Sequence, residues 1–499
     1  MDFLIPNQLS YPILSTLIFL PLAGAVVLFL FKNEKAARIW TLLVSLAAFF
    51  LSLPLYFNFD LATYKYQFAE HAPWIPMFKI NYTLGVDGIS LLLILLSTLL
   101  TPICVLASWK YIEKRVKEFH ICLLFMETAC VGVFSALDFV LFYIFWEAML
   151  VPMYLLIAVW GGPEKVYASI KFFIYTMAGS VFLMVAMIAL YLAAGTFSIP
   201  ELMTHHYSFA FQFWIFLAFG IAFAIKVPMA PFHTWLPAAH VQAPTAGSVL
   251  LASILLKMGT YGFVRFCLPI TPQASLYFAP YLLWMSIISI IYGGYVALGQ
   301  SDMKKLIAYS SVAHMGFVTL GIFLFNKQGM EGAILQMINH GITTGALFLC
   351  VGIIYERTHS REISDNSGLS KIMPYYIGFL GFFSLSSMAF PGTNSFVGEL
   401  LVLIGTFLNN KIVGALSIPG VVLAAAYMLR LLQKIAWGPN LGTHHFFDLN
   451  AREIVYLIPL AVFVLWIGFA PTPFLDVMHA SVDHLIKQVQ AGSALALVK

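Results

Sequence analysis

Long apolar stretches recur along nearly the whole 499-residue sequence and constrain its fold more than any other feature. Each has about 18 residues or more, enough for a helix to cross a hydrocarbon layer roughly 30 Å thick. Hydrophobic residues make up 61% of the chain and charged residues 10%, so a soluble domain of this length would lack polar surface. The runs are continuous rather than alternating, which excludes a β-barrel. The sequence predicts an all-α polytopic membrane protein with about 14 transmembrane helices.

The predicted spans are joined by mostly short connections. They cover residues 11–31, 40–57, 89–109, 119–136, 139–160, 172–194, 209–226, 243–268, 277–298, 306–325, 332–355, 375–408, 413–437 and 454–470. The first is followed by Lys32 and Lys35 without a small-residue cleavage site, so we expect a retained helix. The long connection 58–88 holds Pro73, Trp74 and Pro76. We expect it to form an ordered cap, with a flexible linker as the alternative.

Two of these spans are interrupted. The seventh ends at Lys226, before Pro228 and Pro231, and prolines cannot continue a regular helix. The twelfth contains Pro391 and Gly392, followed by Glu399. Paired broken helices five spans apart indicate two repeats of inverted topology. We predict inverted five-helix repeats at residues 119–268 and 277–437. Residues 1–118 would hold three helices and the long loop, and residues 438–499 the last helix and a tail.

Lysine and arginine are distributed unevenly over the loops. One side receives Lys32, Lys35, Arg38, Lys110, Lys114, Arg115, Lys117, Lys165, Lys171, Lys304, Lys305, Arg357, Arg361, Lys371, Arg430, Lys434 and Arg452. The other side receives Lys65, Lys79, Arg265, Lys327, Lys411, Lys487 and Lys499. Because cytoplasmic loops are enriched in these residues, we predict that both termini lie outside, which also requires an even number of spans.

Several classes of site have no support in the sequence. The five cysteines are scattered without a CxxC spacing, which argues against iron–sulfur, c-type haem and structural zinc sites. There is no glycine-rich nucleotide-binding motif. The net charge of +4 is explained by the loop asymmetry rather than by nucleic acid. We therefore expect no cofactor, no metal and no nucleic acid bound to this chain.

Six ionisable residues fall near the middle of their spans. They are Glu147, Lys226, Lys257, His314, His340 and Glu399. Such residues are costly inside a membrane and mark ion or proton pathways by default. A single opposite charge about 4 Å away is worth roughly 4 kcal/mol at an effective dielectric of about 20. Movement of Glu147 toward or away from Lys226 would therefore load the lysine with a proton or unload it.

Each of these residues also has a structural explanation. A Glu147–Lys226 ion pair could serve only to hold helices together, and a histidine on a membrane helix is often a packing residue. His233 and His240 flank the first break, as possible gates or as partners for backbone groups that the prolines leave free. Glu127 is expected to be a helix-contact carboxylate. No spacing of histidine, cysteine and carboxylate residues indicates a metal.

The segments that carry these residues resemble a known family. Residues 142–162, 226–262, 301–317 and 390–403 are similar to the antiporter-like subunits of respiratory complex I and of multisubunit cation/proton antiporters. The resemblance covers about residues 90–437. Glu399, in the sequence FVGELL, is similar to the M-type subunits of complex I, whereas L-type and N-type subunits carry a lysine there.

The resemblance implies a function and assigns roles to residues. It implies a non-redox, proton-pumping subunit of NADH:quinone oxidoreductase, coupled to remote quinone reduction. Glu147 and Lys226 would form the switchable pair, and protons would pass through Lys257, His314 and His340 to Glu399. The implied partners are L-type, N-type and other membrane-arm subunits, lipid, protons and ordered water, with flavin and iron–sulfur clusters in other subunits. The implied location is an energy-transducing membrane, with the bacterial inner membrane expected and both termini periplasmic.

Two alternatives remain open at this point. One is a subunit of a multisubunit sodium/proton antiporter without redox chemistry. The other is a passive membrane scaffold for a redox complex, whose buried lysines are inert.

Overall fold

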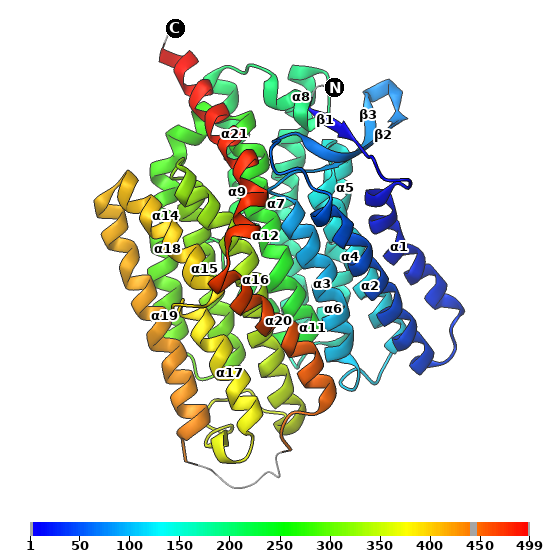
Figure 1. The fold of residues 1–499 in the computed structure, drawn as a ribbon, viewed down its shortest axis with the longest axis vertical. Coiled ribbons are helices and arrows are strands. Elements are labelled where there is room, and N and C mark those ends of the chain that lie inside the picture. The colour runs from blue at the N-terminus through cyan, green and yellow to red at the C-terminus, as the bar shows by residue number, and fades with distance from the viewer. Residues whose placement is uncertain (1–2, 440–446, 498–499) are drawn as a thin grey trace.

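The protein is a bundle of helices that run roughly along one axis, with a small sheet at one end (Figure 1). The structure, a computed structural model, describes residues 3–439 and 447–497. Within these residues, thirteen helical segments are long and apolar enough to cross a membrane. Two shorter helices separated by a break, α17 (Pro374–Ser387) and α18 (Asn394–Asn409), make a fourteenth crossing. The predicted all-α membrane fold with about 14 crossings is confirmed.

The crossings follow the predicted order. The first seven are α1 (Ile13–Val27, continued by η1, Leu28–Leu30), α2 (Glu34–Phe57), α3 (Leu91–Ser108), α4 (Val116–Ser135), α5 (Phe139–Ala148) with α6 (Leu150–Trp160), α7 (Lys165–Ala194) and α9 (Phe209–Lys226). The eighth consists of α11 (Thr245–Leu250), η3 (Leu251–Leu255), α12 (Leu256–Gly262), η4 (Phe263–Cys267) and α13 (Leu268–Ile270). The others are α14 (Pro272–Leu298), α15 (Met303–Ile322), α16 (Lys327–Thr358), α19 (Lys411–Trp437) and α20 (Ala451–Phe469). The short helices are α8 (Ile199–Thr204), α10 (Trp235–Gln242) and η5 (Leu369–Lys371).

Side-chain caps fix where several crossings begin. The carboxylate of Asp138 accepts hydrogen bonds from the first turn of α5, and that of Asp302 does so for α15. Asn450 and Glu453 form a reciprocal capping box at the start of α20. Each cap satisfies backbone N–H groups that have no partner inside their helix.

The long connection before α3 folds into the sheet. Strand β1 (Leu4–Pro6) pairs in parallel with β2 (Tyr66–Ile75), and β2 pairs antiparallel with β3 (Ile80–Val86) across η2 (Pro76–Phe78). The carboxylate of Glu70 accepts hydrogen bonds from Leu14 N and Ser15 N, at 2.8 and 3.1 Å, which attaches the sheet to the start of α1. The ordered cap is confirmed, although its strands were not predicted. We call this end of the bundle the hairpin face.

The C-terminal tail forms a helix, α21 (Thr472–Leu497), that extends to the hairpin face. Strand β1 and the end of α21 lie at the same end of the bundle, as an even number of crossings requires (Figure 1). Gly88 N donates to Ser481 Oγ at 3.1 Å, which ties α21 to the chain just before α3. Lys499, which contributed to the loop asymmetry, lies outside the described residues.

Two crossings form the centre of the bundle. Every residue in the most apolar stretch of α16 is buried, and the same holds for the eighth crossing. Two thirds of the corresponding stretches of α2, α7 and α20 are not buried, as expected of helices that face lipid. Ionisable side chains on the two central crossings therefore lie inside protein.

Candidate functional site

The first break lies where the prolines predict it. Helix α9 ends at Lys226, and turns lead to α10, which begins at Trp235. Trp235 Nε1 donates to Ile225 O at 2.8 Å, and Ala230 N donates to Ser289 Oγ at 2.9 Å. Irregular backbone at membrane depth is tolerated when protein groups satisfy it in this way. The break is therefore a defined part of the structure.

The structure shows Lys226 and Glu147 apart from each other, with no ion pair between them. Lys226 is buried, and its Nζ donates to Met149 Sδ at 3.4 Å and lies 5.0 Å from the centre of the Trp146 ring. Among the described residues, no carboxylate oxygen lies within 4.0 Å of this amine. Trp146 and Met149 share one helix face, whereas Glu147 projects about 100° away from Trp146. The amine thus occupies the aromatic face beside Glu147 without contacting its carboxylate.

Lys257 lies between two π-helical segments, η3 and η4. Such segments are rare and occur frequently at functional sites. The side chain is fully buried, and its Nζ lies 2.6 Å from both Ala252 O and His340 Nδ1. This amine therefore joins the eighth crossing directly to α16.

A glycine brings the first break close to this helix. A Cβ at Gly259 would lie 2.9 Å from Val227 N, closer than such atoms approach each other without a shift of the backbone. Gly259 follows Lys257 by two residues, and Val227 directly follows Lys226. The backbones that carry the two lysines are therefore in contact.

Four of the predicted residues lie in a row through α12, α16, α15 and α18. Lys257 contacts His340, whose ring centre lies 5.9 Å from that of His314. His314 Nδ1 lies 2.8 Å from Glu399 Oε1, which also accepts a hydrogen bond from Gln336 Nε2 at 3.0 Å. We call Lys257, His340, His314 and Glu399 the central row. All four are buried.

The second break is held by uncharged polar residues that the search for ionisable groups missed. The Oδ1 of Asn394 accepts hydrogen bonds from Ser386 Oγ at 2.6 Å and Thr343 Oγ1 at 3.2 Å. Asn339 Nδ2 donates to the carbonyl oxygen of Asn394 at 2.8 Å. Gly392 has a φ of +89°, which favours glycine. These contacts fix the start of α18, the helix that carries Glu399.

Two further missed residues contact His314. Its Nε2 lies 3.0 Å from the hydroxyl of Tyr427 and 3.3 Å from that of Ser387. Some of the polar residues around the two histidines and the second break could have been found from the sequence. Polar side chains recur on α16 at the i, i+3, i+4 and i+7 spacing of one helix face. Those positions are Gln336, Asn339, His340 and Thr343.

The remaining candidates lie outside the central row. His240 is buried and stacks on Phe348, with ring centres 4.6 Å apart. His233 packs against Tyr292 at 5.1 Å. Glu127 is buried, and both of its carboxylate oxygens lack a hydrogen-bond partner among the described residues. The prediction that Glu127 is a helix-contact carboxylate thus finds no polar contact in this structure.

Metal and thiol chemistry have no visible centre in the described part of the chain. No group of three or more histidine, cysteine, aspartate or glutamate side chains is arranged there to hold an ion. The five cysteines are buried and free. The arrangement offers instead a series of buried groups that can each hold or release a proton.

Comparison with known proteins identifies the family. Residues 16–132 match the family described as NADH-ubiquinone oxidoreductase chain 4, amino terminus, and residues 136–424 match NADH:quinone oxidoreductase/Mrp antiporter. The chain is 46% identical over 500 residues to subunit M of NADH-quinone oxidoreductase from Rhodobacter capsulatus, covering 96% of this chain and 97% of the relative. The chain belongs to the subunit M/chain 4 family. Chain 4 of Marchantia polymorpha is 44% identical over 486 residues, covering 96% of this chain and 97% of the relative.

Solved structures agree with membership of the subunit M/chain 4 family. A chain of respiratory complex I from Thermus thermophilus superposes with a TM-score of 0.89 at 30% identity, covering 95% of this chain and 99% of that one. A chain of the Mrp complex from Dietzia has a TM-score of 0.83 at 21% identity, covering 97% of this chain and 56% of that one. At that identity the likeness shows a shared fold alone. The protein is thus an antiporter-like membrane subunit of the complex I type.

Proposed function

We propose that this chain moves protons across an energy-transducing membrane, as a non-redox subunit driven by quinone reduction elsewhere in an NADH:quinone oxidoreductase. The observation that carries the proposal is the central row, which links Lys257 to Glu399 through two histidines. Ionisable groups inside a membrane are costly, and by default they mark ion or proton pathways. Membership of the subunit M/chain 4 family supports the same conclusion.

Lys226 and Glu147 act as the switch. In this structure the amine of Lys226 lies against Trp146 and Met149 and does not contact the carboxylate of Glu147. With the carboxylate at about 4 Å, the attraction would reach roughly 4 kcal/mol at an effective dielectric of about 20, more than at the present separation, and would favour the protonated amine. Retreat would favour release of the proton. A rotation of α5 or α9, driven by a neighbouring subunit, would change this separation.

The central row carries the proton onward. The ammonium of Lys257 donates directly to His340 Nδ1, and an imidazole can accept a proton on one nitrogen and release one from the other. His314 lies next in the row and contacts Glu399, the terminal carboxylate. Tyr427 and Gln336 hold these two groups in position.

Ordered water connects the groups that do not touch. His340 Nε2, Glu399 Oε2, Glu147 Oε1 and both ring nitrogens of His240 are buried without a hydrogen-bond partner among the described residues. Buried polar atoms are nearly always hydrogen-bonded, to water where protein offers no partner. The positions of His233 and His240, beside the first break, suit them to gate water access to Lys226 and Lys257.

The uneven distribution of lysine and arginine over the loops supports an orientation with the hairpin face outside and the lysine-rich face in the cytoplasm. The expected membrane is the bacterial inner membrane, with both termini periplasmic. The expected neighbours are L-type, N-type and other membrane-arm subunits, together with lipid. Flavin and iron–sulfur clusters belong to partner subunits. The sodium/proton antiporter alternative is disfavoured, because the relatives at 42–46% identity are subunits of NADH oxidoreductases.

Substitution of Glu399 by glutamine tests the proposal. Glutamine retains a hydrogen bond to His314 but cannot carry a proton, so NADH-driven proton uptake by inverted vesicles is expected to fall by about three- to tenfold. The amount of assembled complex, measured on native gels, is expected to stay unchanged. Glu164→Gln, at an exposed position, is the matched control. Unchanged pumping in Glu399→Gln would remove Glu399 from the pathway.

A further inference from the structure

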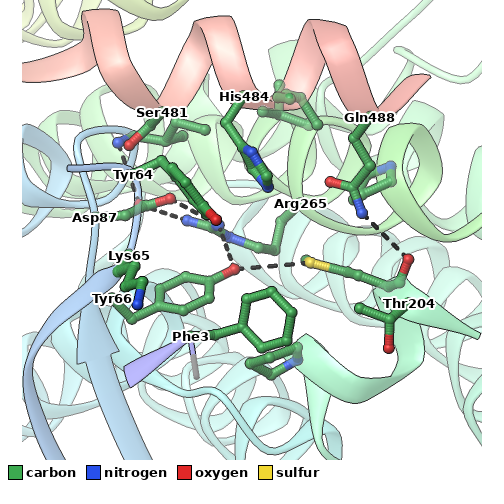
Figure 2. Close-up of a pocket in the computed structure, with 16 residues that line it drawn as sticks. Phe3, Tyr64, Lys65, Tyr66, Asp87, Thr204, Arg265, Ser481, His484 and Gln488 are labelled. Carbon is green, nitrogen blue, oxygen red and sulfur yellow. Dashed lines mark hydrogen bonds and ion pairs between the residues drawn. The ribbon is translucent and has the colours of Figure 1, made fainter. Parts of the chain in front are cut away.

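A small cavity of about 50 Å³ lies at the hairpin face, between the sheet, α8, the eighth crossing and α21 (Figure 2). Its rim carries the partly exposed side chains of Tyr64, Lys65 and His484. Its floor is formed by Asp87 and Arg265, which are only 3% and 5% exposed. The volume suits a few water molecules. Solvent from the hairpin face can therefore reach this buried ion pair.

The rim also offers a proton acceptor. The ring of His484 stacks on that of Tyr64, with centres 3.7 Å apart. Burial lowers the pKa of His484, the charge of Lys487 lowers it further, and Asp87 acts in the opposite direction. This imidazole is therefore largely neutral at neutral pH. The rim could therefore take up a proton that arrived from the eighth crossing. A barrier to such movement has to lie at the floor of the cavity, between the rim and Lys257.

The floor is closed by four hydrogen bonds from Arg265, which involve all three nitrogens of its guanidinium. Its two terminal nitrogens donate to the two oxygens of Asp87 at 2.8 and 2.6 Å, and one of them also donates to the Tyr66 hydroxyl at 2.9 Å. Its Nε donates to the Tyr261 hydroxyl at 3.0 Å. A guanidinium does not release its proton in proteins. Arg265 therefore cannot act as a relay.

Neither of the two tyrosine hydroxyls in this network donates to a group that can pass a proton on. Tyr66 donates to Met203 Sδ at 3.7 Å, and Tyr261 donates to Phe134 O at 3.4 Å. A group that relays a proton must accept one and pass one on, whereas a thioether and a peptide carbonyl have no proton to pass on. The network therefore begins at a permanent cation and ends at acceptors, which makes it a poor conductor of protons.

This closed network lies on the same crossing as Lys257. Arg265 follows Lys257 by eight residues, or about 12 Å along a helix that rises about 1.5 Å per residue. The amine of Lys257 bonds Ala252 O, which precedes it in the chain, and His340 on α16. It thus points away from Arg265. Among the described residues, no hydrogen bond connects Lys257 to the cavity.

We propose that the Asp87–Arg265 pair, with Tyr66 and Tyr261, is an insulating seal at the outer end of the eighth crossing. The seal keeps a proton held by Lys257 from leaving directly into the cavity, so that it passes through the central row to Glu399. It sets the direction of transfer without carrying protons itself. This inference rests on the proposed function, which makes Lys257 a proton carrier.

A purely structural role for the pair makes a different prediction. Asp87 also accepts hydrogen bonds from Ile89 N and Ser90 N, so the pair attaches the start of α3 to the eighth crossing. If attachment were its only role, two neutral replacements of similar size would behave alike. If it is a seal, a replacement that binds water should leak and an apolar one should not.

The test compares two double variants of the complete complex in liposomes. One combines Asp87→Asn with Arg265→Gln, and the other combines Asp87→Leu with Arg265→Met. Passive proton flux under an imposed pH gradient is measured with an internal pH dye and without NADH. The amide pair is expected to raise the flux at least about threefold, because amides bind water in the path. The apolar pair is expected to match the wild type, since buried ion pairs can often be replaced by apolar groups.

Adding Lys257→Met to the amide variant is expected to abolish the extra flux. Equal flux in the two double variants, or a leak that survives Lys257→Met, would overturn the seal. If the amide variant does not assemble, Arg265→Lys replaces it, because lysine retains the charge but can release a proton; wild-type flux in that variant would also overturn the seal. Because passive flux is measured without NADH, a result that overturns the seal is distinguishable from a result that overturns NADH-driven pumping.

Discussion

Replacement of Lys257 by methionine is expected to lower NADH-driven proton pumping by about tenfold or more, without loss of the assembled complex. Methionine fills a similar volume and suits an apolar core, but it cannot carry the proton that His340 receives. Lys257 is fully buried and is the member of the central row on the crossing that contacts the first break. Loss of this amine therefore interrupts the proposed proton path between Lys226 and the two histidines of the central row.

Two further substitutions at this position separate charge from proton exchange. Lys257→Arg retains a positive charge but does not release a proton, so it should be as inactive as methionine. Lys257→His restores a titratable group and should recover part of the pumping. Lys411→Met, at an exposed position, controls for loss of a lysine. Pumping is measured by dye quenching in inverted vesicles, and assembly by native electrophoresis. Full pumping in the arginine variant would show that Lys257 contributes only charge.

The sequence predicted the crossings and both breaks because their causes are local. Apolar length determines a crossing, and proline determines an interruption, so the end of α9 at Lys226 could be read from Pro228 and Pro231. The depth of an ionisable residue also follows from its position in a run. This reasoning selected all four members of the central row, which the structure brings together.

Features that depend on contacts between distant segments could not be predicted in the same way. The π-helical segments beside Lys257 have no signature in composition. The position of Lys226 on Trp146 rather than on Glu147 depends on how α9 is rotated against α5. Arg265 was counted as a loop cation, although its charge is buried against Asp87 from the connection before α3. For both Lys226 and Arg265, the partner lies far away in the sequence.

Replacement of Lys226 by methionine is also expected to reduce pumping by about tenfold, and the effect should depend on Glu147. If the two residues form one switch, Glu147→Gln alone should reduce pumping as well, and the double variant should be no worse than Lys226→Met. Groups that act as a unit show this non-additivity, whereas independent sites give effects that multiply. The two side chains do not touch in this structure, so such coupling would require a second arrangement in which they approach.

The measurement is a double-mutant cycle on the initial rate of proton uptake, normalised to the amount of assembled complex. Trp146→Phe serves as a companion variant, because it retains an aromatic face under the amine of Lys226. It should change the rate far less than Lys226→Met if the lysine works by exchanging a proton. A double variant whose loss equals the product of the two single losses would show that Glu147 and Lys226 act separately. The switch would then have to be sought in another partner of Lys226.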